Sequence, residues 1–318
     1  MLLWYNIFYI KKNDHKPENR RGLKVYFSYE ECRLVLNEMD CASMLKSPLV
    51  INWNINGRCQ NNCIYCFSND YTSMPDLLSE SELNNIINNL KSLKPLVVVI
   101  SGGEPLLYPK LKYVLNELTN FCSVILDTNG LCLDTSFINY CKNNKILIRV
   151  SLDDHRSYIN DNIRISSIKN STTIVLSKIQ KLLSLNAHFI IHSVLSDKNS
   201  NRIVEFGELL LNIGIKFWEI QVVVPFKGDR LSLEEDLCQL EKFSLNNENK
   251  LKIKIHTNNE DEKGIILINP KGEFLTRKTN SLEKEYIDLN NIYNPPLNIL
   301  MNALDIHNHF KRYTGNII

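Results

Sequence analysis

The sequence predicts an α/β fold, a partial (β/α)6 TIM-like barrel with a small N-terminal α+β element and a C-terminal α+β extension. Between about residues 49 and 228, short runs rich in Val, Ile and Leu alternate with amphipathic helical patterns, which is typical of repeated βα units and a parallel sheet. Six such runs are present, fewer than the eight strands of a closed barrel. In folds of this kind, chemistry gathers at the carboxyl ends of the strands.

Each unit of the repeat can be followed along the chain. The expected strands are dominated by Val, Ile, Leu or aromatic residues, and they cover residues 49–55, 96–100, 123–127, 146–152, 188–194 and 217–224. The clearest helix begins at Ser79, because Glu82 three residues later completes a capping box. A second helix is expected to start near Pro109, since proline suits a first helical turn.

Two flanks do not follow the βα repeat. The chain is therefore divided into an N-terminal α+β element, a core and a C-terminal extension, at residues 1–47, 48–230 and 231–318. The first flank is expected to hold two strands and a helix, at residues 1–10, at residues 23–27 and from Ser28 onward. The second is expected to hold a helix, a pair of strands and a hairpin turn, at residues 231–243, 252–255 with 264–268, and Pro270 to Gly272.

Composition and charge describe an ordinary soluble globular protein. Of the 318 residues, 44% are hydrophobic and 23% are charged, and the net charge of +2 gives no reason to expect a nucleic-acid partner. No apolar stretch approaches the roughly 20 residues that span a bilayer, so no membrane association is expected. The apolar residues 1–10 lack the flanks of a signal peptide, and we expect a cytoplasmic location. The nine cysteines should then stay reduced, as metal ligands or buried thiols.

Three of these cysteines stand within eight residues directly after the first expected strand, in the run Cys59-Gln-Asn-Asn-Cys63-Ile-Tyr-Cys66. Thiolates at this spacing can hold one soft metal centre. A structural zinc site normally takes four ligands, and the nearest further cysteines are Cys41 and Cys122. Three thiolates would leave one iron of a cubane cluster open to another ligand. The six remaining cysteines lack metal-ligand spacing, and we expect them to be buried free thiols.

Polar or glycine-rich segments end the next three expected strands. They are Ser101-Gly102-Gly103-Glu104-Pro105, Thr128-Asn129-Gly130 and Ser151-Leu152-Asp153, in that order. Glycines permit a close backbone approach, and a carboxylate suits a cation. These segments stand at the carboxyl ends of the expected strands, where chemistry gathers in folds of this kind.

This combination resembles the radical S-adenosylmethionine (SAM) superfamily, in which a CxxxCxxC loop follows the first strand of a βα barrel. The resemblance covers about residues 49–228 and implies that residues 48–230 are a radical SAM core. It implies that Cys59, Cys63 and Cys66 hold a catalytic 4Fe-4S cluster. It also implies contacts to SAM. The ammonium group is expected at Gly102, Gly103 and Glu104, the ribose and methionine parts at Thr128, Asn129, Ser151 and Asp153, and the carboxylate at Arg164. Adenine is expected beside Tyr65 and Phe226, and Val194, at the end of the fifth strand, is a further expected contact.

The resemblance also implies a mechanism and a subgroup. An external electron donor, flavodoxin- or ferredoxin-like, reduces the cluster, which splits SAM into methionine and a 5'-deoxyadenosyl radical that abstracts hydrogen from the substrate. From Ser151 to Pro225 the motifs are similar to those of the subgroup that modifies peptides and proteins. Its members usually carry a cysteine-rich SPASM or twitch extension with auxiliary clusters. No cysteine follows Cys238 here, so we expect a degenerate extension without its metal.

Three functions stay open at this point. The first is modification of a ribosomally synthesised peptide or protein, which would then be the partner of this chain. The second is radical chemistry on a small molecule or nucleotide, because the cysteines for auxiliary clusters are missing. The third is a non-catalytic metal-binding or interaction module. The intact cysteine and Gly-Gly-Glu motifs argue against the third, since a purely structural protein has no physical need for three clustered thiols.

Overall fold

The computed structural model describes residues 47–66, 68, 78–222, 233–256, 265–277 and 286–288. Contacts within the chain define two compact units, residues 1–46 and residues 47–318, and the described residues all belong to the second. The two strands and the helix predicted before residue 47 therefore lie outside the described residues.

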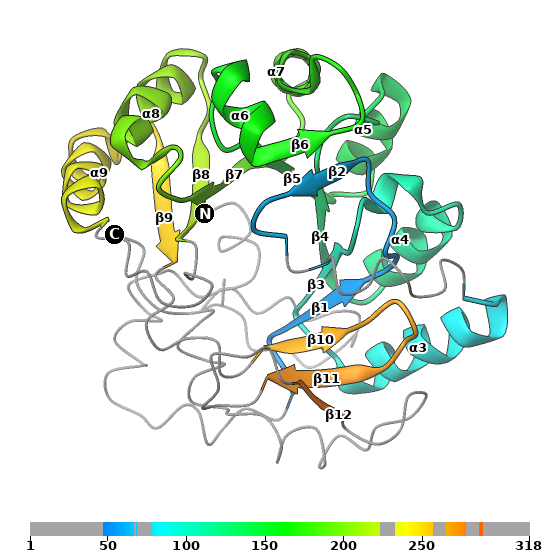
Figure 1. Cartoon of the computed structure of the whole chain (residues 1–318). Helices are drawn as coiled ribbons and strands as arrows, with labels where there is room; N and C mark the ends of the chain where they lie inside the picture. Colours follow the sequence, from blue (N-terminus) through cyan, green and yellow to red (C-terminus); the bar gives the residue numbers. More distant parts are fainter. Residues whose placement is uncertain are drawn as a thin grey trace, which may run out of the picture. The chain divides into compact units, whose positions relative to one another are not determined.

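A ten-stranded, mostly parallel sheet forms the centre of the second unit. Its strand order is β12-β11-β10-β1-β3-β4-β5-β7-β8-β9. All six predicted repeat strands are present, and they are β1 (Val50–Asn54), β3 (Val97–Ser101), β4 (Ser123–Thr128), β5 (Leu147–Ser151), β7 (Phe189–Leu195) and β8 (Phe217–Val222). The sheet curves into an open, partial TIM-like barrel, which confirms the predicted fold class (Figure 1).

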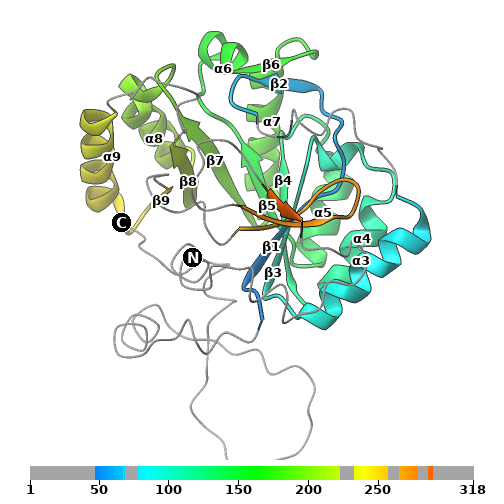
Figure 2. The same cartoon turned by 60° about the horizontal axis from the view of Figure 1, so that its bottom comes forward.

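Helices follow the strands and cover the outer side of the curved sheet (Figures 1 and 2). They are α3 (Glu80–Leu93), α4 (Leu111–Thr119), α5 (Thr135–Asn143), α6 (Ser157–Ile163), α7 (Ser171–Ser184), α8 (Ile203–Asn212) and α9 (Glu234–Asn247). The predicted capping box of α3 is confirmed, with Ser79 and Glu82 bonded in both directions. Pro109 lies ahead of α4 rather than in its first turn, because a turn from the Tyr108 carbonyl to the Leu111 N–H precedes the helix.

The two faces of the sheet carry different residues. Trp218 of β8 packs edge-on against Phe206 of α8, with ring centroids 5.4 Å apart, which marks the face that the helices cover. Ile191 stands next to Trp218 in register, Val150 stands next to Ile191, and all three side chains are buried. Because side chains alternate along a strand, the neighbouring positions, among them Arg149, point to the opposite, inner face.

The C-terminal part of the unit extends the sheet at both edges. β9 (Lys252–His256) pairs with β8, and β10 (Ile266–Ile268) pairs with β1, both in parallel. The predicted pairing of these two segments with each other is wrong, because each instead completes an otherwise unpaired edge of the barrel. The predicted hairpin turn is confirmed, since β10 and β11 (Phe274–Arg277) are antiparallel and β12 (Tyr286–Asp288) follows β11.

Short elements complete the architecture. β2 (Asn61–Cys63) and β6 (Arg164–Ser166) form a separate antiparallel ribbon that the sequence analysis did not predict. Two 3-10 turns, η3 (Pro105–Leu107) and η4 (Ser200–Arg202), follow the ends of β3 and β7. Among the described helices, none has the length and apolar character that crossing a membrane requires.

Candidate cofactor site

The cysteine motif lies on the loop after β1 and on the ribbon strand that follows. Within the ribbon, Cys63 stands opposite Arg164, although the two residues are far apart in the sequence. Backbone hydrogen bonds of 3.0 Å from Ile64 to Ile163 and 2.9 Å from Ser167 to Gln60 extend this pairing. The ribbon therefore fixes the cysteine loop to the segment that carries Arg164.

The glycine pair after β3 packs directly against this loop. Gly103 N–H donates to the Asn56 carbonyl at 2.8 Å, and Glu104 N–H donates to the Arg58 carbonyl at 2.6 Å. A Cβ on Gly103 would lie 2.1 Å from the Arg58 carbonyl oxygen, and one on Gly102, at φ +131°, would lie 2.5 Å from the Asn56 oxygen. Glycine is therefore required at these two positions because the backbone of residues 56–58 of the same chain passes close to them.

Glu104 joins this loop to the end of β4. The fully buried carboxylate accepts hydrogen bonds from Thr128 Oγ1 at 2.8 Å, from Asn129 N–H at 2.7 Å and from Leu106 N–H at 3.0 Å. Burial raises the pKa of Glu104 to about 7, although these hydrogen bonds oppose the rise. Three of the predicted site residues are therefore in direct contact around one carboxylate.

The three thiols lie within electrostatic reach of one another. Burial raises the pKa of the Cys63 thiol to about 11, and the charges of Cys66 and Cys59 add to the rise. Cys59 Sγ accepts hydrogen bonds from the Asn61 backbone N–H at 3.3 Å and from Asn129 Nδ2 at 3.7 Å. Such donors stabilise negative charge on ligating sulfur and tune iron–sulfur centres. The thiols and their donors therefore fit an iron–sulfur cluster.

Within the described ranges, no three His, Cys, Asp or Glu side chains come close enough to hold a single metal ion. In a cubane, each thiolate binds a different iron atom. Cys141 is a buried free thiol as predicted, but the prediction is wrong for Cys132 and Cys238, which are exposed. Cys132 lies at the site periphery, because its sulfur accepts a hydrogen bond of 2.9 Å from Gln60 Nε2.

Tyr65, Arg164 and Asp153 are bonded to one another. Arg164 Nη1 donates to the Tyr65 hydroxyl at 2.6 Å and lies 3.4 Å from Asp153 Oδ2, to which the Tyr65 hydroxyl also donates. Burial lowers the pKa of Arg164, but the charges of Tyr65, Cys63 and Asp153 outweigh it and raise the pKa well above its ordinary value. Sequence reasoning assigned these side chains to three separate parts of SAM, whereas the structure brings them into one contact group.

Two predicted contact residues keep unused hydrogen-bonding groups. Nε and Nη2 of Arg164 have no partner in the part of the chain that the structure describes, so one edge of the guanidinium stays open to a carboxylate. The half-buried Ser151 hydroxyl likewise has no partner among the described residues. Phe226, predicted beside adenine, lies outside the described residues.

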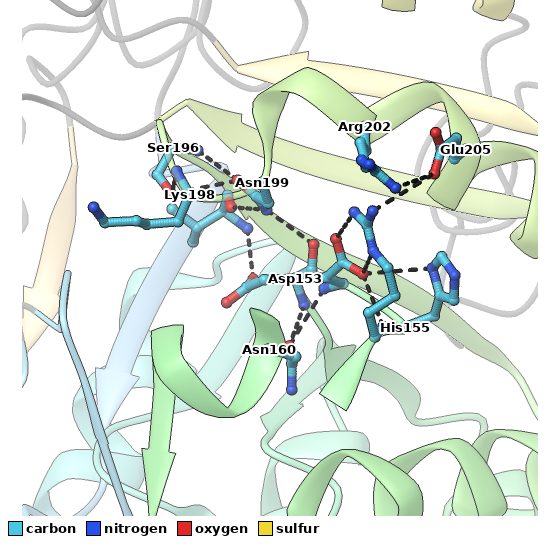
Figure 3. Close-up of polar contacts among 11 residues, drawn as sticks. Asp153, His155, Asn160, Ser196, Lys198, Asn199, Arg202 and Glu205 are labelled. Atoms are coloured by element: carbon cyan, nitrogen blue, oxygen red, sulfur yellow. Dashed lines mark hydrogen bonds and ion pairs between the residues drawn. The ribbon is translucent and has the colours of Figure 1, made fainter. Parts of the chain in front are cut away.

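Sequence reasoning missed the amide side chains that hold Asp153 from its other sides. Figure 3 shows Asn160 Oδ1 accepting from the Asp153 N–H at 3.0 Å and Asn199 Nδ2 donating to the Asp153 carbonyl at 2.9 Å. Asp153 Oδ1 in turn accepts the Val194 N–H at 2.8 Å. The only signal in the sequence is an asparagine near a strand end, which is common in turns and indicates no specific role.

A charged network on the inner face of the sheet was also missed. Arg149 of β5 contacts Asp127 of β4 through two hydrogen bonds of 2.6 and 2.7 Å, and its Nη1 donates to Glu219 of β8 at 2.8 Å. His256 Nε2 of β9 lies 2.7 Å from the other Glu219 oxygen. His192 of β7 stands beside Glu219 in register. The inner face below the strand ends is therefore polar, unlike the apolar interior of a closed barrel.

The fold and the site define a class: an open α/β barrel with a cysteine-rich cofactor loop after its first strand and polar residues at the following strand ends. Residues 53–210 match the profile described as the Radical SAM superfamily. The chain therefore belongs to the radical SAM superfamily through this domain, and it is a radical SAM enzyme by family, as the motifs predicted. The superfamily implies SAM and an iron–sulfur cluster as cofactors.

Named relatives share parts of the chain. The AdoMet-dependent heme synthase of Methanosarcina barkeri is 26% identical over 191 residues, 59% of this chain and 54% of its own length. Mycofactocin maturase MftC of Mycobacterium tuberculosis is 25% identical over 173 residues, 54% of this chain and 44% of its own. The chain thus spans about half the length of these relatives. The structure of Streptococcus suis SuiB bound to precursor peptide SuiA is 15% identical, with a TM-score of 0.66 over 88% of this chain and 72% of SuiB, and it shares the fold.

Proposed function

We propose that this protein binds a 4Fe-4S cluster through Cys59, Cys63 and Cys66 and cleaves SAM reductively at that site. The observation that carries the proposal is the packing of the cysteine loop against the Gly102–Gly103–Glu104 loop, with the thiols near one another and two N–H donors directed at Cys59. A bound cluster would supply the electron that splits SAM into methionine and a 5'-deoxyadenosyl radical. The electron comes from a flavodoxin- or ferredoxin-like donor, and a cytoplasmic setting keeps the free thiols reduced.

Arg164 and Ser151 are the proposed direct contacts to SAM with the clearest support. The unused Nε and Nη2 edge of Arg164 matches the two oxygens of the SAM carboxylate, and its raised pKa keeps it charged. The free Ser151 hydroxyl suits a ribose hydroxyl. Tyr65, Val194 and Phe226 are the proposed contacts for adenine.

Glu104 provides negative charge for the SAM ammonium group beside Gly102 and Gly103. Since its pKa is raised to about 7 by burial, an adjacent ammonium favours the ionised form. Thr128 and Asn129 contribute indirectly, because both donate hydrogen bonds to this carboxylate and hold it in place. Asp153 is likewise a positioning residue rather than a direct contact to SAM, since donors from the protein already bond both of its carboxylate oxygens.

The proposed substrate is a ribosomally synthesised peptide or protein. Support comes from two similar proteins, one named a maturase and the other solved with a precursor peptide. Residues 48–230 then form the radical SAM core, 1–47 an accessory element and 231–318 a degenerate SPASM-like extension. A small-molecule substrate is the second candidate, because the heme synthase matches a slightly larger share of this chain than the maturase does.

The test is anaerobic reconstitution with iron and sulfide, followed by dithionite, SAM and chromatography for 5'-deoxyadenosine, with iron counted per chain. About four irons per chain and 5'-deoxyadenosine formation are expected. Cys63→Ala should abolish both. Cys122→Ala is the matched control, because this half-buried thiol lies at the start of β4, at the opposite end of that strand from Thr128.

Two results would contradict the proposal. Well-folded wild-type protein that takes up no iron and forms no 5'-deoxyadenosine would remove the cluster assignment. Equal loss in Cys63→Ala and Cys122→Ala would show that the motif thiols have no special role. To separate the two substrate classes, candidate peptides and small molecules are added, and only a true substrate should give a product whose amount tracks 5'-deoxyadenosine.

A further inference from the structure

Asn199 is a fully buried amide whose two polar atoms are both engaged. Its Nδ2 donates to the Asp153 carbonyl at 2.9 Å and to the Val194 carbonyl at 3.0 Å. Its Oδ1 accepts the Ser196 N–H at 2.9 Å. Figure 3 shows this side chain between the end of β5 and the segment after β7. Asn199 thus joins the residues that follow the last backbone pairing between β5 and β7.

The reason for this bridge lies in the sheet. β5 and β7 are in register up to Ser151 and His192, and the last backbone bond runs from Leu152 N–H to the His192 carbonyl. Beyond this point Val194 has no strand partner on the β5 side. Asp153 Oδ1 accepts its N–H, and Asn199 Nδ2 donates to its carbonyl. The two side chains therefore replace a missing strand at Val194 and satisfy groups that are costly to bury unpaired.

Asp153 continues the connection to the cysteine loop. Its other carboxylate oxygen accepts the Tyr65 hydroxyl and lies 3.4 Å from Arg164 Nη1. A continuous set of contacts therefore runs from Tyr65, beside Cys66, through Asp153 to Asn199 and Val194. Among the described residues, the hydrogen-bond partners of the Asn199 side chain are Asp153, Val194 and Ser196, and they include neither a motif cysteine nor Arg164, so its influence on the cofactor site must pass through Asp153 and Val194.

We propose that Asn199 is a positioning residue for SAM, which holds the Val194 backbone at a fixed separation from Asp153 and thereby from the Tyr65–Arg164 pair. The proposal rests on the proposed function, because Val194 and Arg164 are its contacts for opposite ends of SAM. Removing the amide leaves the Asp153 and Val194 carbonyls without their shared donor. The distance between Val194 and the Tyr65–Arg164 pair is then no longer fixed, while the cysteine ligands are unchanged.

The experiment compares Asn199→Ala and Asn199→Asp with wild-type reconstituted protein. Asp has nearly the same shape but turns the donor into an oxygen that faces two carbonyl oxygens, so it should be the more damaging change. Iron per chain should stay at the wild-type value. The dissociation constant of SAM, measured by equilibrium dialysis, should rise about tenfold or more, equivalent to 1.4 kcal/mol, and the KM for SAM should rise more than kcat falls.

Asn269→Ala is the matched structural control. Asn269 is also buried and its Oδ1 accepts two backbone N–H bonds of 3.0 Å, from Lys271 and Glu273, but it lies in the β10–β11 turn. This variant should lose thermal stability and keep the wild-type affinity for SAM. If Asn199→Ala does not fold, Asn199→Ser, which keeps a short polar side chain, is used in the same comparison.

A double-mutant cycle gives a readout that a merely structural role would not produce. If Asn199 acts through Asp153, the effects of Asn199→Ala and Tyr65→Phe on SAM affinity should be non-additive, because both variants loosen the same residue. Wild-type affinity in the folded Asn199 variants, or strictly additive effects, would overturn the proposal. Failure of the wild-type protein to bind SAM would instead overturn the proposed function, and the role of Asn199 with it.

Discussion

The Arg164 guanidinium donates a 2.6 Å hydrogen bond to the Tyr65 hydroxyl, although 99 positions separate the two residues in the sequence. This bond joins the cysteine loop to the short strand β6, where Cys63 and Arg164 are also opposite each other in the ribbon. A single side-chain contact thus supports the backbone pairing that fixes the loop. The loop geometry should therefore depend on Tyr65 as well as on the cysteines.

Tyr65→Phe should weaken SAM binding. The change removes the hydroxyl that accepts from Arg164 and donates to Asp153, and we expect a stability loss of about 1–2 kcal/mol. The measurements are urea unfolding and the dissociation constant of SAM. Tyr113→Phe is the control, because its hydroxyl donates to Asn84 between α4 and α3, away from the site. An equal change of SAM affinity in both variants would contradict the assigned role of Tyr65.

Gly103→Ala should prevent residues 56–58, which lead into the cysteine motif, from packing against the loop after β3. The new Cβ would lie 2.1 Å from the Arg58 carbonyl oxygen, and backbone atoms cannot move aside as a flexible side chain can. We expect a loss of at least about 2 kcal/mol in unfolding free energy, together with reduced iron uptake. Gly214→Ala is the comparison: its φ of +90° is strained for alanine, but no atom lies within 4 Å. Normal iron content in Gly103→Ala would show that the cysteine loop can move away from the new Cβ and still bind the cluster.

Arg149→Met should be strongly destabilising. It leaves Asp127 and Glu219 on the inner face without their shared cation, and removal of one partner of a buried ion pair costs about 3–5 kcal/mol. Lys91→Met breaks the Glu117 pair, whose lysine side chain is 42% exposed against 18% for Arg149, and should cost less than about 1 kcal/mol. The measurement is urea unfolding, in which the midpoints of the two variants are compared with that of the wild type, provided that the m-values are unchanged. Similar losses in the two variants would refute the importance of the inner-face network.

His192 should make stability depend on pH. Burial, reinforced by the Arg149 charge, lowers its pKa from 6.5 to about 4, although Glu219, Asp127 and Asp153 oppose the shift. The folded state disfavours the protonated ring. The contribution of the neutral His192 ring to the free energy of unfolding is therefore present above pH 6.5 and is lost as the pH falls toward 4. The loss amounts to about 3 kcal/mol.

The check is urea unfolding of the cluster-free protein at pH 7.0 and pH 4.5, beside His192→Gln. The variant carries no ring to protonate, so its stability should fall less between the two pH values than that of the wild type. Parallel falls in both proteins would mean that His192 is not held neutral by its surroundings. Other acid-sensitive groups are common to both proteins, so the difference reports on position 192.

Sequence reasoning located the repeat strands and the two clearest helices because their signals are local. The apolar runs at β1 and β3 and the Ser79–Glu82 capping box depend on residues a few positions apart. The same holds for the order of the cofactor motifs, since each follows a strand directly. It failed where the partner is distant: β9 and β10 are strand-like on their own, but nothing nearby in the sequence indicates that each pairs with a different edge of the sheet.

The sequence by itself determined the class of this protein: an α/β barrel with three cysteines after its first strand, and a radical SAM domain recognisable from those motifs. Only the tertiary structure decided how the site residues contact one another. Glu104 meets Thr128 and Asn129, Asn199 meets Asp153 and Val194, and glycine is required where residues 56–58 pass close by. The physical reason is that a motif specifies which groups reach a strand end, whereas hydrogen-bond partners and close contacts depend on the packing of segments distant in the chain.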